Sequence, residues 1–244
     1  MARRKGDPVH GWFVLNKPVG ITSTKALSIV RRALNANKAG HAGTLDPLAD
    51  GVLPLAFGEA IKTVPYLVDA RKSYRFTVRW GEETSTDDRE GHVVRSSELR
   101  PSGEDVLRAV PAFIGRVLQV PPAFSAIMVD GERAYDLARD GVEVVLQARE
   151  TDIYRVEIVD TPDPGHTTFD MTCGKGTYVR AFARDIGRTL GCFGHVVALT
   201  RTAVGPFSLS GAISLEMLEE SAKDGAAKRS LMPLATVLDD IPAL

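Results

Sequence analysis

Apolar and polar positions alternate along parts of the chain with the period of a β-strand. The clearest case is residues 73–80, where every second residue is a large apolar one, from Tyr74 to Trp80. Residues 11–15 form a continuous apolar run, which predicts a buried strand. Residues 142–160 and 167–173 alternate like paired strands, with a Pro-Asp-Pro-Gly turn between them. These segments predict the strands of a sheet.

Apolar residues at helical spacing predict helices elsewhere. Ser23 is the expected N-cap of a helix whose apolar stripe is Leu27, Val30 and Leu34. Ser102 begins a second helix, with Asp105 at the capping-box position and Gly115 as its stop. A third helix begins at Arg180, beside an apolar stripe that consists of Val179, Phe182, Ile186 and Leu190. An arginine in that place is expected to be partly buried with a partner.

Weaker patterns predict two further elements. Residues 59–70 begin like a helix, but Pro65 interrupts the pattern. Residues 120–131 predict a short hairpin with Asp130 and Gly131 as its tight turn. A short helix is expected to follow, with Ala134, Leu137 and Ala138 on one face and Gly141 as its stop.

One acidic residue, Asp46, lies in the glycine- and proline-rich first half of residues 40–58, whose second half is apolar enough for a buried strand. By composition alone, an aspartate in such a loop is most often an Asx-turn residue. However, residues 40–49 read Gly-His-Ala-Gly-Thr-Leu-Asp-Pro-Leu-Ala. This run resembles the signature loop of the bacterial tRNA pseudouridine-55 synthases, the TruB family. The resemblance implies that Asp46 is a catalytic nucleophile and that His41 enters the RNA.

Three more segments before residue 91 resemble the same family. Residues 16–23 are similar to its first characteristic segment, and residues 58–62 to its Gly-Glu-Ala-x-Lys segment. The resemblance implies that Lys17 and Lys62 bind substrate. In Lys-Ser-Tyr-Arg, residues 72–75, it implies that Tyr74 stacks on the target base. In the acidic loop 81–91, the family's active-site aspartate aligns with Asp88; Asp87 fits nearly as well, and a solvated turn is the alternative.

The second half of the chain carries two more family segments. A Gly-Lys-Gly-Thr string at residues 174–177 is no Walker A phosphate loop, because Phe169 stands where its first glycine would be. Residues 175–180 are instead similar to the family's Lys-Gly-Thr-Tyr-x-Arg signature. This similarity implies that Arg180 pairs with the catalytic aspartate and that Tyr178 lines the pocket. Residues 194–201 match a further segment, which implies that Leu199 packs under the flipped uracil; core packing is the simpler interpretation.

Residues 120–150 resemble the family's Pro-Pro-x-Tyr-Ser-Ala-x-Lys segment and the mobile thumb that clamps the RNA. The chain departs from it with Phe124 for the tyrosine and Met128 for the lysine, so those RNA contacts are in doubt. We expect a basic tail at 1–8, one catalytic domain at 9–244 and a C-terminal helix and tail at 211–244. Family members usually continue into an RNA-binding PUA domain, which this chain is expected to lack.

Composition limits the function classes. A hydrophobic content of 44% and a charged content of 25% are ordinary for a soluble globular protein, and no apolar run approaches the roughly 18 residues that span a bilayer. The N-terminal apolar run is too short for a signal peptide, so a cytoplasmic protein is expected. Cys173 and Cys192 indicate neither a disulfide framework nor a zinc site, and no histidine spacing calls for a metal.

The net charge of −1 argues against a nucleic-acid partner only until its distribution is considered. Lys and Arg exceed Asp and Glu by 8 in residues 1–79 and by 4 in residues 171–210, whereas residues 80–170 carry −10 and residues 211–244 carry −3. The basic segments hold the motifs. They predict a positive RNA-binding surface with an acidic back, although ordinary patchiness is the alternative. Lys25, Arg31, Arg32 and Lys38 fit phosphate contact and a solvated helix face equally well.

The chemistry implied by the resemblance needs no cofactor. Pseudouridine forms when the N1–C1′ bond of uridine breaks and the uracil is rejoined through C5, with no gain or loss of electrons. An ionised carboxylate can act as the nucleophile, at either C6 or C1′, if a cation keeps it charged. The base must also leave its stack, at a cost that His41 and a stacked Tyr74 would offset.

The resemblance therefore implies an α/β fold built round a mixed, largely antiparallel sheet flanked by helices. It implies a tRNA pseudouridine-55 synthase that acts on the T stem-loop, as a monomer with no obligatory protein partner. One alternative is an RNA chaperone that folds tRNA without chemistry. Another is an aspartyl hydrolase whose second carboxylate would be Asp50 or Asp88.

Overall fold

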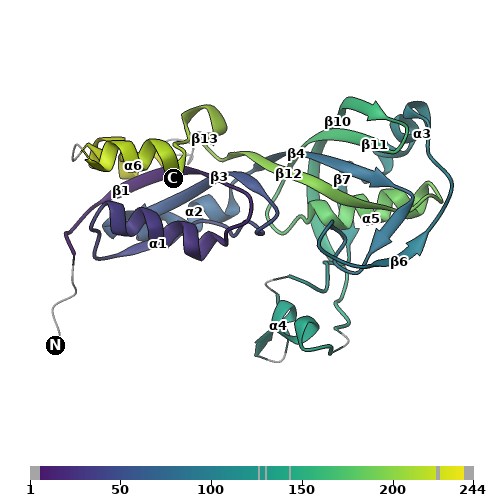
Figure 1. The fold of residues 1–244 in the computed structure, drawn as a ribbon, viewed down its shortest axis with the longest axis horizontal. Helices are drawn as coiled ribbons and strands as arrows, with labels where there is room; N and C mark the ends of the chain where they lie inside the picture. Colours follow the sequence, from purple (N-terminus) through teal and green to yellow (C-terminus); the bar gives the residue numbers. More distant parts are fainter. Residues whose placement is uncertain (1–5, 126, 130, 143, 224–225, 239–244) are drawn as a thin grey trace. The chain divides into compact units, whose positions relative to one another are not determined.

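The computed structural model describes residues 6–125, 127–129, 131–142, 144–223 and 226–238. The chain forms two compact units (Figure 1). Unit 1 consists of Met1–Ser73 with Thr200–Leu244, and unit 2 consists of Tyr74–Leu199. Strand β12 (Gly194–Val204) therefore belongs to both units, and unit 1 is built from the two ends of the sequence.

The sheet of unit 1 is centred on β3 (Asp50–Phe57), the apolar second half of the Asp46 segment. The predicted strand at 11–15 is confirmed as β1 (Gly11–Lys17), which pairs antiparallel with β3 along its whole length. The short β2 (Ala39–His41) is also antiparallel to β3, whereas β12 pairs with it in parallel. The hairpin partner of β12 is β13 (Phe207–Ser208). The mixed, largely antiparallel sheet is thus confirmed.

Helix α1 (Ser23–Ala33) shows why one predicted boundary is wrong. The N-cap is Thr22, whose side chain accepts a hydrogen bond from the Lys25 amide at 3.1 Å. Ser23 is the first helical residue because its hydroxyl is used elsewhere, by both backbone polar groups of Leu45. The residue thus joins the start of the helix to the Asp46 loop.

The other helices of unit 1 are short. The 3₁₀ helix η1 (Gly58–Thr63) leads into α2 (Val64–Asp69), where Pro65 lies in the first turn. A proline lacks only an amide that has no helical partner there, so Pro65 begins the helix rather than interrupting it. Helix α6 (Leu215–Lys223) packs against β1 and α1. Three 3₁₀ turns complete the unit, namely η3 (Leu209–Gly211), η4 (Ala227–Ser230) and η5 (Leu234–Val237).

The sheet of unit 2 has the strand order β12-β4-β11-β10-β7. The clearest alternating segment is confirmed as β4 (Lys72–Trp80), in which Phe76, Val78 and Trp80 are buried. The antiparallel pair β10 (Arg149–Asp163) and β11 (His166–Cys173) is confirmed, but the prediction that β10 begins at 142 is wrong. Strand β10 begins at Arg149, which pairs with Gln119, the last residue of β7 (Gly115–Gln119). The described residues just before Arg149 have no strand partner on β7.

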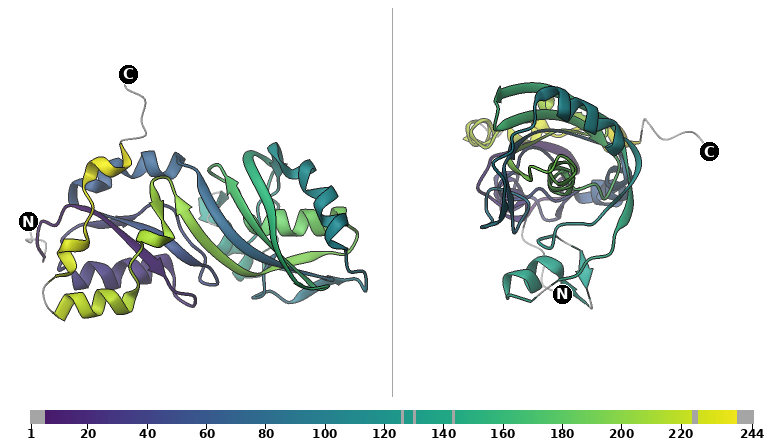
Figure 2. Two further views of the ribbon diagram at one scale, coloured as in Figure 1. Left: turned by 90° about the horizontal axis from the view of Figure 1, so that it is seen from above. Right: turned by 90° about the vertical axis from the view of Figure 1, so that its right-hand side faces the viewer.

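The strands of unit 2 curve round helix α5 (Val179–Thr189), as Figure 2 shows. Phe76, Phe169 and Phe182 meet there with ring centroids 5.4–5.7 Å apart, in stacked and edge-on contacts that favour aromatic pairs. A Cβ atom on Gly187 would lie 2.5 Å from the Gly194 amide, so the helix can approach β12 this closely only with glycine at that position.

The remaining elements of unit 2 lie at its periphery. The capping box at Ser102 is confirmed at the start of α3 (Gly103–Ala109), which continues as the 3₁₀ helix η2 (Val110–Phe113) because Pro111 has no amide to extend it. Strands β5 (Glu82–Thr84) and β6 (Val93–Ser96) form a separate hairpin. The predicted hairpin and helix near 130 are confirmed as β8 (Met128–Val129), β9 (Glu132–Arg133) and α4 (Ala134–Arg139). Asp130, the predicted turn residue, is outside the described residues.

Within the described ranges, no helix is both long and apolar enough to cross a membrane.

Candidate active site

The residues singled out in the sequence fall on both units, and each group is described within its own unit. Unit 1 carries Lys17, His41, Asp46 and Lys62, and unit 2 carries Tyr74, Asp88, Tyr178, Arg180 and Leu199.

Asp46 lies half-buried in a loop that is fixed on both sides. On one side, the Ser23 hydroxyl accepts from the Leu45 amide at 2.8 Å and donates to the Leu45 carbonyl at 3.0 Å. On the other, the amide of Gly20 donates to the Pro47 carbonyl at 2.8 Å. A buried serine that satisfies both polar groups of one residue leaves that residue little freedom. The backbone around Asp46 is therefore well positioned.

A buried arginine that the sequence analysis did not single out also holds this loop. Arg201 on β12 is only 2% exposed, and its guanidinium donates to the carbonyls of Val52, Gly43 and Thr44 at 2.8, 3.1 and 3.4 Å. A guanidinium presents several donors in a rigid fork, which suits three carbonyls at once. The signal in the sequence is a charged residue two positions after the apolar run 196–199.

Lys17 places a second buried cation in unit 1. Its ammonium donates to the carbonyls of Pro18 and Ile21, both at 2.9 Å, and its side chain is fully buried. Burial lowers the pKa of Lys17 to about 8, against the opposing attraction of the Asp50 and Asp46 carboxylates. The geometry gives Lys17 a positioning role; its role in binding substrate stays a prediction.

The other two predicted residues of unit 1 differ in environment. His41 ends β2, and burial followed by the nearby Arg201 lowers its pKa, which favours the neutral imidazole at pH 7. Its Nδ1 atom is buried with no hydrogen-bond partner among the described residues. The Lys62 side chain is 76% exposed and pairs with Glu59 one turn earlier. Lys62 is thus accessible to a ligand.

In unit 2, Arg180 is a buried residue with partners, as the helical pattern predicts. Its guanidinium donates to the carbonyls of Thr86 and Phe124 at 3.0 and 2.9 Å, and it lies 3.3 Å from an Asp88 carboxylate oxygen. The Asp88 side chain is almost fully buried and also accepts from the Glu90 amide at 2.9 Å and from the Thr86 hydroxyl. Asp88 is therefore not a solvated turn residue.

The neighbouring Asp87 has a different arginine partner. Its carboxylate accepts from Arg184 at 2.8 Å, and both side chains are 9% exposed. Burial raises the pKa of Asp87 to about 6, although the positive charges of Arg184 and Arg180 oppose the rise. The loop is thus charged on two successive residues, each facing an arginine of α5. The sequence analysis did not single out Arg184.

The apolar and aromatic candidates of unit 2 lie on three elements. Tyr74 is partly buried on β4, and Leu199 on β12 is 8% exposed. Tyr178 is the N-cap residue of α5, where its backbone is held by the Gln119 side chain through hydrogen bonds of 3.0 and 3.3 Å. The backbone just before Arg180 is therefore tied to β7.

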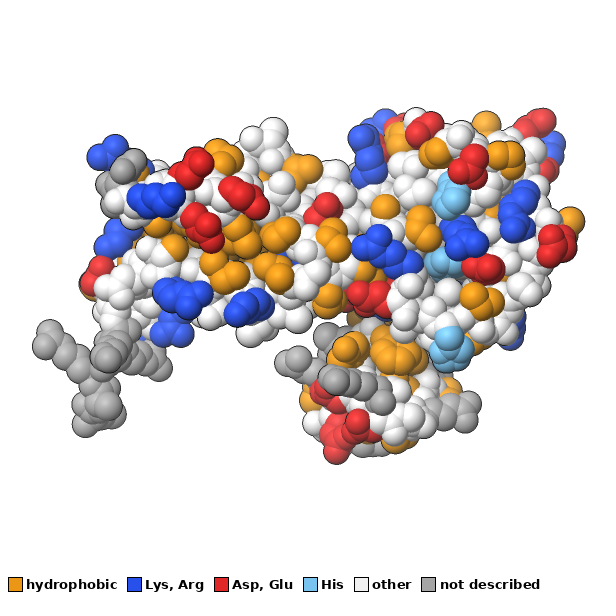
Figure 3. Space-filling view, viewed as in Figure 1, with side chains coloured by type: hydrophobic (Ala, Val, Ile, Leu, Met, Phe, Trp, Pro, Cys, Tyr) orange, Lys and Arg blue, Asp and Glu red, His pale blue; other side chains and the backbone are white. Residues whose placement is uncertain are grey.

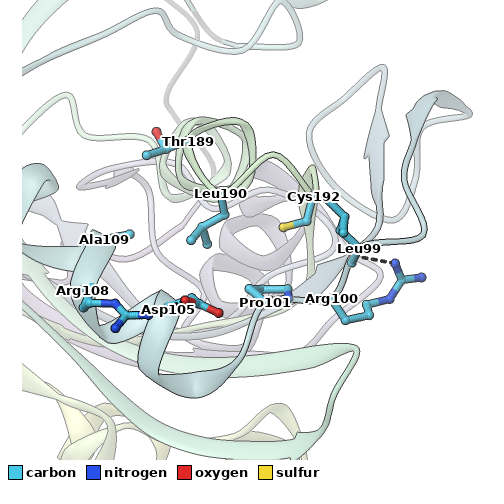
Figure 4. A pocket seen from close by; sticks show the side chains of 9 residues that line it. All are labelled: Leu99, Arg100, Pro101, Asp105, Arg108, Ala109, Thr189, Leu190 and Cys192. Carbon is cyan, nitrogen blue, oxygen red and sulfur yellow. Dashed lines mark hydrogen bonds and ion pairs between the residues drawn. The ribbon is translucent and has the colours of Figure 1, made fainter.

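Two other cavities contain none of the predicted residues. One, of about 470 Å³ in unit 2, is shown in Figure 4 with its lining from Leu99 to Cys192. Its two arginines are engaged locally: Arg100 donates to two carbonyls of its own loop and Arg108 pairs with Asp105. The other, of about 400 Å³, lies beside α2 in unit 1 and has a mostly apolar lining. Among the described residues, no group of His, Cys, Asp or Glu could hold a metal ion.

A basic surface lies on the exposed side of α1. Lys25, Arg31 and Arg32 are exposed there, and Figure 3 shows blue side chains gathered over this helix. On the face of unit 2 that the figure displays, basic and acidic side chains are instead interspersed. The hydrogen bonds of Ser23 to Leu45 connect α1, which carries the basic surface, directly to the Asp46 loop.

Comparison with known proteins gives consistent matches. Residues 31–179 match the model of the TruB family pseudouridylate synthase (N terminal domain), and residues 180–239 match the tRNA pseudouridylate synthase B C-terminal domain. The tRNA pseudouridine synthase B of Caulobacter vibrioides is 59% identical over 245 residues, covering 100% of this chain and 79% of the relative. That of Nitrobacter winogradskyi is 53% identical over 247 residues, covering 99% of this chain and 69% of the relative.

Solved structures give the same picture of the fold. A chain in the crystal structure of a Cbf5–Nop10–Gar1 complex is 25% identical, with a TM-score of 0.73 over 93% of this chain. A chain in the structure of an H/ACA RNP bound to a substrate RNA containing 2′-deoxyuridine is 23% identical, with a TM-score of 0.71 over 97% of this chain. The present chain spans 61% and 66% of those two chains, which is less than two thirds of either.

Proposed function

Because the chain belongs to the TruB family of pseudouridylate synthases, we propose that it uses Asp46 as a nucleophile on a uridine at position 55 of the tRNA T loop. The coarser activity follows from the family itself: the protein is an enzyme that isomerises uridine to pseudouridine in tRNA. The target position and the nucleophile are the proposal.

The observation that carries the proposal is the rigid support of the Asp46 loop. Ser23 and Arg201 hold the backbone just before Asp46, and the Gly20 amide holds the Pro47 carbonyl just after it. The Lys17 ammonium contributes positive charge nearby. A nucleophile must be ionised and must be held in an attacking geometry, because misplacement by about 1 Å costs much of the rate. The support of this loop suits the second requirement.

The reaction balances without a cofactor. The N1–C1′ bond breaks, a C5–C1′ bond forms, the hydrogen on C5 leaves as a proton, and N1 gains a proton. Asp46 carries one of the two fragments while the uracil turns. We assign Arg180 as a cation that favours this ionised carboxylate and Asp88 as the residue that orients Arg180, since their side chains are 3.3 Å apart.

The remaining residues are assigned to handling of the RNA. A target base must leave its stack, which costs a few kcal/mol, and aromatic stacking returns about 1–3 kcal/mol per base. Tyr74 supplies an aromatic face, Tyr178 and Leu199 supply apolar contact, and the neutral His41 fills space in the RNA. The exposed Lys62 is suited to a phosphate.

The test is release of tritium from a tRNA transcript that carries C5-tritiated uridine. We expect the wild type to release one equivalent per tRNA, and a transcript with cytidine at position 55 to release none. Asp46→Asn should reduce release by at least about a thousandfold, because an amide is a poor nucleophile. Asp50→Asn is the matched control, as a carboxylate four residues away, and should retain most of the activity.

Two outcomes would contradict the proposal. Unchanged release from the cytidine-55 transcript would show that another uridine is the target. Full activity of Asp46→Asn would exclude Asp46 as the nucleophile. Binding of tRNA with no release by the wild type would instead favour an RNA-folding role.

A further inference from the structure

Two buried arginines on α5 make the same pair of contacts one helical turn apart. Arg180 faces Asp88 and donates to the Phe124 carbonyl at 2.9 Å. Arg184 faces Asp87 and donates to the Val120 carbonyl at 2.7 Å. Each guanidinium therefore links one aspartate of the 84–91 loop to one carbonyl of residues 120–124.

The loop end of this link is fixed to the sheet. The Asp87 carbonyl accepts from the Val196 amide at 3.1 Å, and the Arg89 amide donates to the Val196 carbonyl at 3.0 Å. Asp87 itself has a φ of +59°, a left-handed conformation that is uncommon for a residue with a side chain. A non-glycine residue is retained in that conformation where its side chain is needed.

The other end of the link is the root of residues 120–148, the stretch that leaves β7 and returns at β10. Beyond residue 124, backbone hydrogen bonds among the described residues of this stretch are local. Examples are the Tyr135 amide to the Ser125 carbonyl at 2.9 Å and the Ala134 amide to the Ile127 carbonyl at 2.7 Å. Arg180 and Arg184 thus provide side-chain hydrogen bonds that join α5 to the start of this stretch.

From this geometry we infer that Arg184, paired with Asp87, is a positioning residue that anchors the root of residues 120–148 and thereby sets the affinity for the RNA. The inference rests on the proposed function and on the expectation, implied by the family resemblance, that this stretch clamps the RNA. Arg180 also contacts this root, but it is assigned to the chemistry. A substitution of Arg184 should therefore change the affinity for RNA and leave the reaction step intact.

The chemistry of the pair explains why arginine is needed. A lysine at 184 would keep a positive charge for Asp87, but its single ammonium has no fork that reaches a carboxylate and a distant carbonyl in fixed geometry. Asp87 in turn depends on that charge, because its burial already opposes ionisation. Groups facing Asp87 are Arg184 and Arg180 from α5 and Glu83 from β5.

The first experiment needs no RNA. Hydrogen exchange in Arg184→Lys should be about tenfold faster than in the wild type in peptides covering 120–148, since charge-assisted hydrogen bonds are among the strongest in proteins. Arg188→Lys is the matched control. Arg188 lies one turn further along α5, and its guanidinium donates to Glu83 at 2.7 and 2.8 Å instead of to a carbonyl of the root. Its exchange at 120–148 should equal that of the wild type.

The second experiment separates affinity from chemistry. In steady-state tritium release, Arg184→Lys should raise KM for the tRNA transcript about tenfold and leave kcat within about threefold of the wild type. Asp87→Asn, which keeps the side-chain size and removes its charge, should move KM in the same direction. Arg188→Lys should change neither constant.

The outcomes distinguish this inference from the proposed function. If the wild type releases no tritium from uridine 55, the proposed function fails, and hydrogen exchange still tests the anchor. If the wild type is active, unchanged exchange at 120–148 or unchanged KM in a folded Arg184→Lys overturns the inference. A loss of kcat with unchanged KM also overturns it, because Arg184 would then act on the reaction.

Discussion

The buried Arg201 supports the backbone of the Asp46 loop, and the buried Lys17 supports the backbone of residues 18–21. Arg201 and Lys17 are both fully buried, and both donate hydrogen bonds to backbone carbonyls. Burying a charge is costly unless its donors are satisfied, so these residues are retained where they hold a loop in one shape. The positive charge near Asp46 is a second result of the same placement.

Lys17 makes stability depend on pH in an unusual direction. Its pKa is about 8 in the folded protein and 10.5 when unfolded, so between these values the unfolded chain binds more protons. The free energy of unfolding should therefore rise with pH across this window, by up to about 1.4 kcal/mol per pH unit from this group. Urea denaturation at pH 7.5, 8.5 and 9.5 measures the effect.

The control is Lys17→Met, because other groups also titrate in this range. The difference in unfolding free energy between the wild type and Lys17→Met should become more favourable to the wild type as the pH rises. A difference that stays constant from pH 7.5 to 9.5 would show that Lys17 titrates normally.

At the scale of elements, the start of α1 has two adjacent residues with separate tasks. Thr22 caps the helix, and Ser23 holds both backbone polar groups of Leu45, the neighbour of Asp46. Ser23→Ala leaves two buried backbone groups unsatisfied, which should cost about 1–3 kcal/mol of stability and lower kcat at least about tenfold. Thermal unfolding and tritium release measure the two effects.

Thr22→Ala is the comparison. Loss of the cap should cost about 1 kcal/mol of stability while kcat stays near the wild-type value, since the Thr22 hydroxyl bonds to the helix amide of Lys25. Equal losses of kcat in the two variants would mean that the helix as a whole, not the hydrogen bonds of Ser23, supports Asp46.

The elements themselves were largely predictable, because each depends on local pattern. The period-two alternation of β4 and the capping box of α3 are visible in fewer than ten residues each. The long-range hydrogen bonds of Arg201 and Arg184 were not predictable. Arg201 reaches a carbonyl 157 positions away and Arg184 a carboxylate 97 positions away, and only the tertiary fold brings such groups together. Arg180 could be singled out because a family motif contains it.

At the scale of the whole molecule, the distribution of charge over the surface predicts RNA binding better than the net charge does. The chain carries a net charge of −1, yet exposed basic residues gather on α1. Contacts to phosphates release counterions, so tRNA affinity should fall steeply with salt. In Lys25→Gln/Arg32→Gln, the slope of log affinity against log salt should be smaller by about 2, if both residues contact phosphates.

Arg108→Gln/Arg155→Gln is the charge-matched control, since these arginines pair with Asp105 and Glu157. Its salt slope should equal that of the wild type, measured by filter binding between about 50 and 200 mM salt. Equal slopes in all three proteins would show that α1 is an ordinary solvated helix.

The construction of unit 1 from both ends of the sequence also fixes an order of events on the ribosome. Residues 74–199 form one uninterrupted stretch, which leaves the ribosome before Thr200 does. The Asp46 loop emerges far earlier but lacks Arg201 until that point. The nascent chain therefore holds the Asp46 loop through Ser23, but without the hydrogen bonds of Arg201, until β12 has emerged.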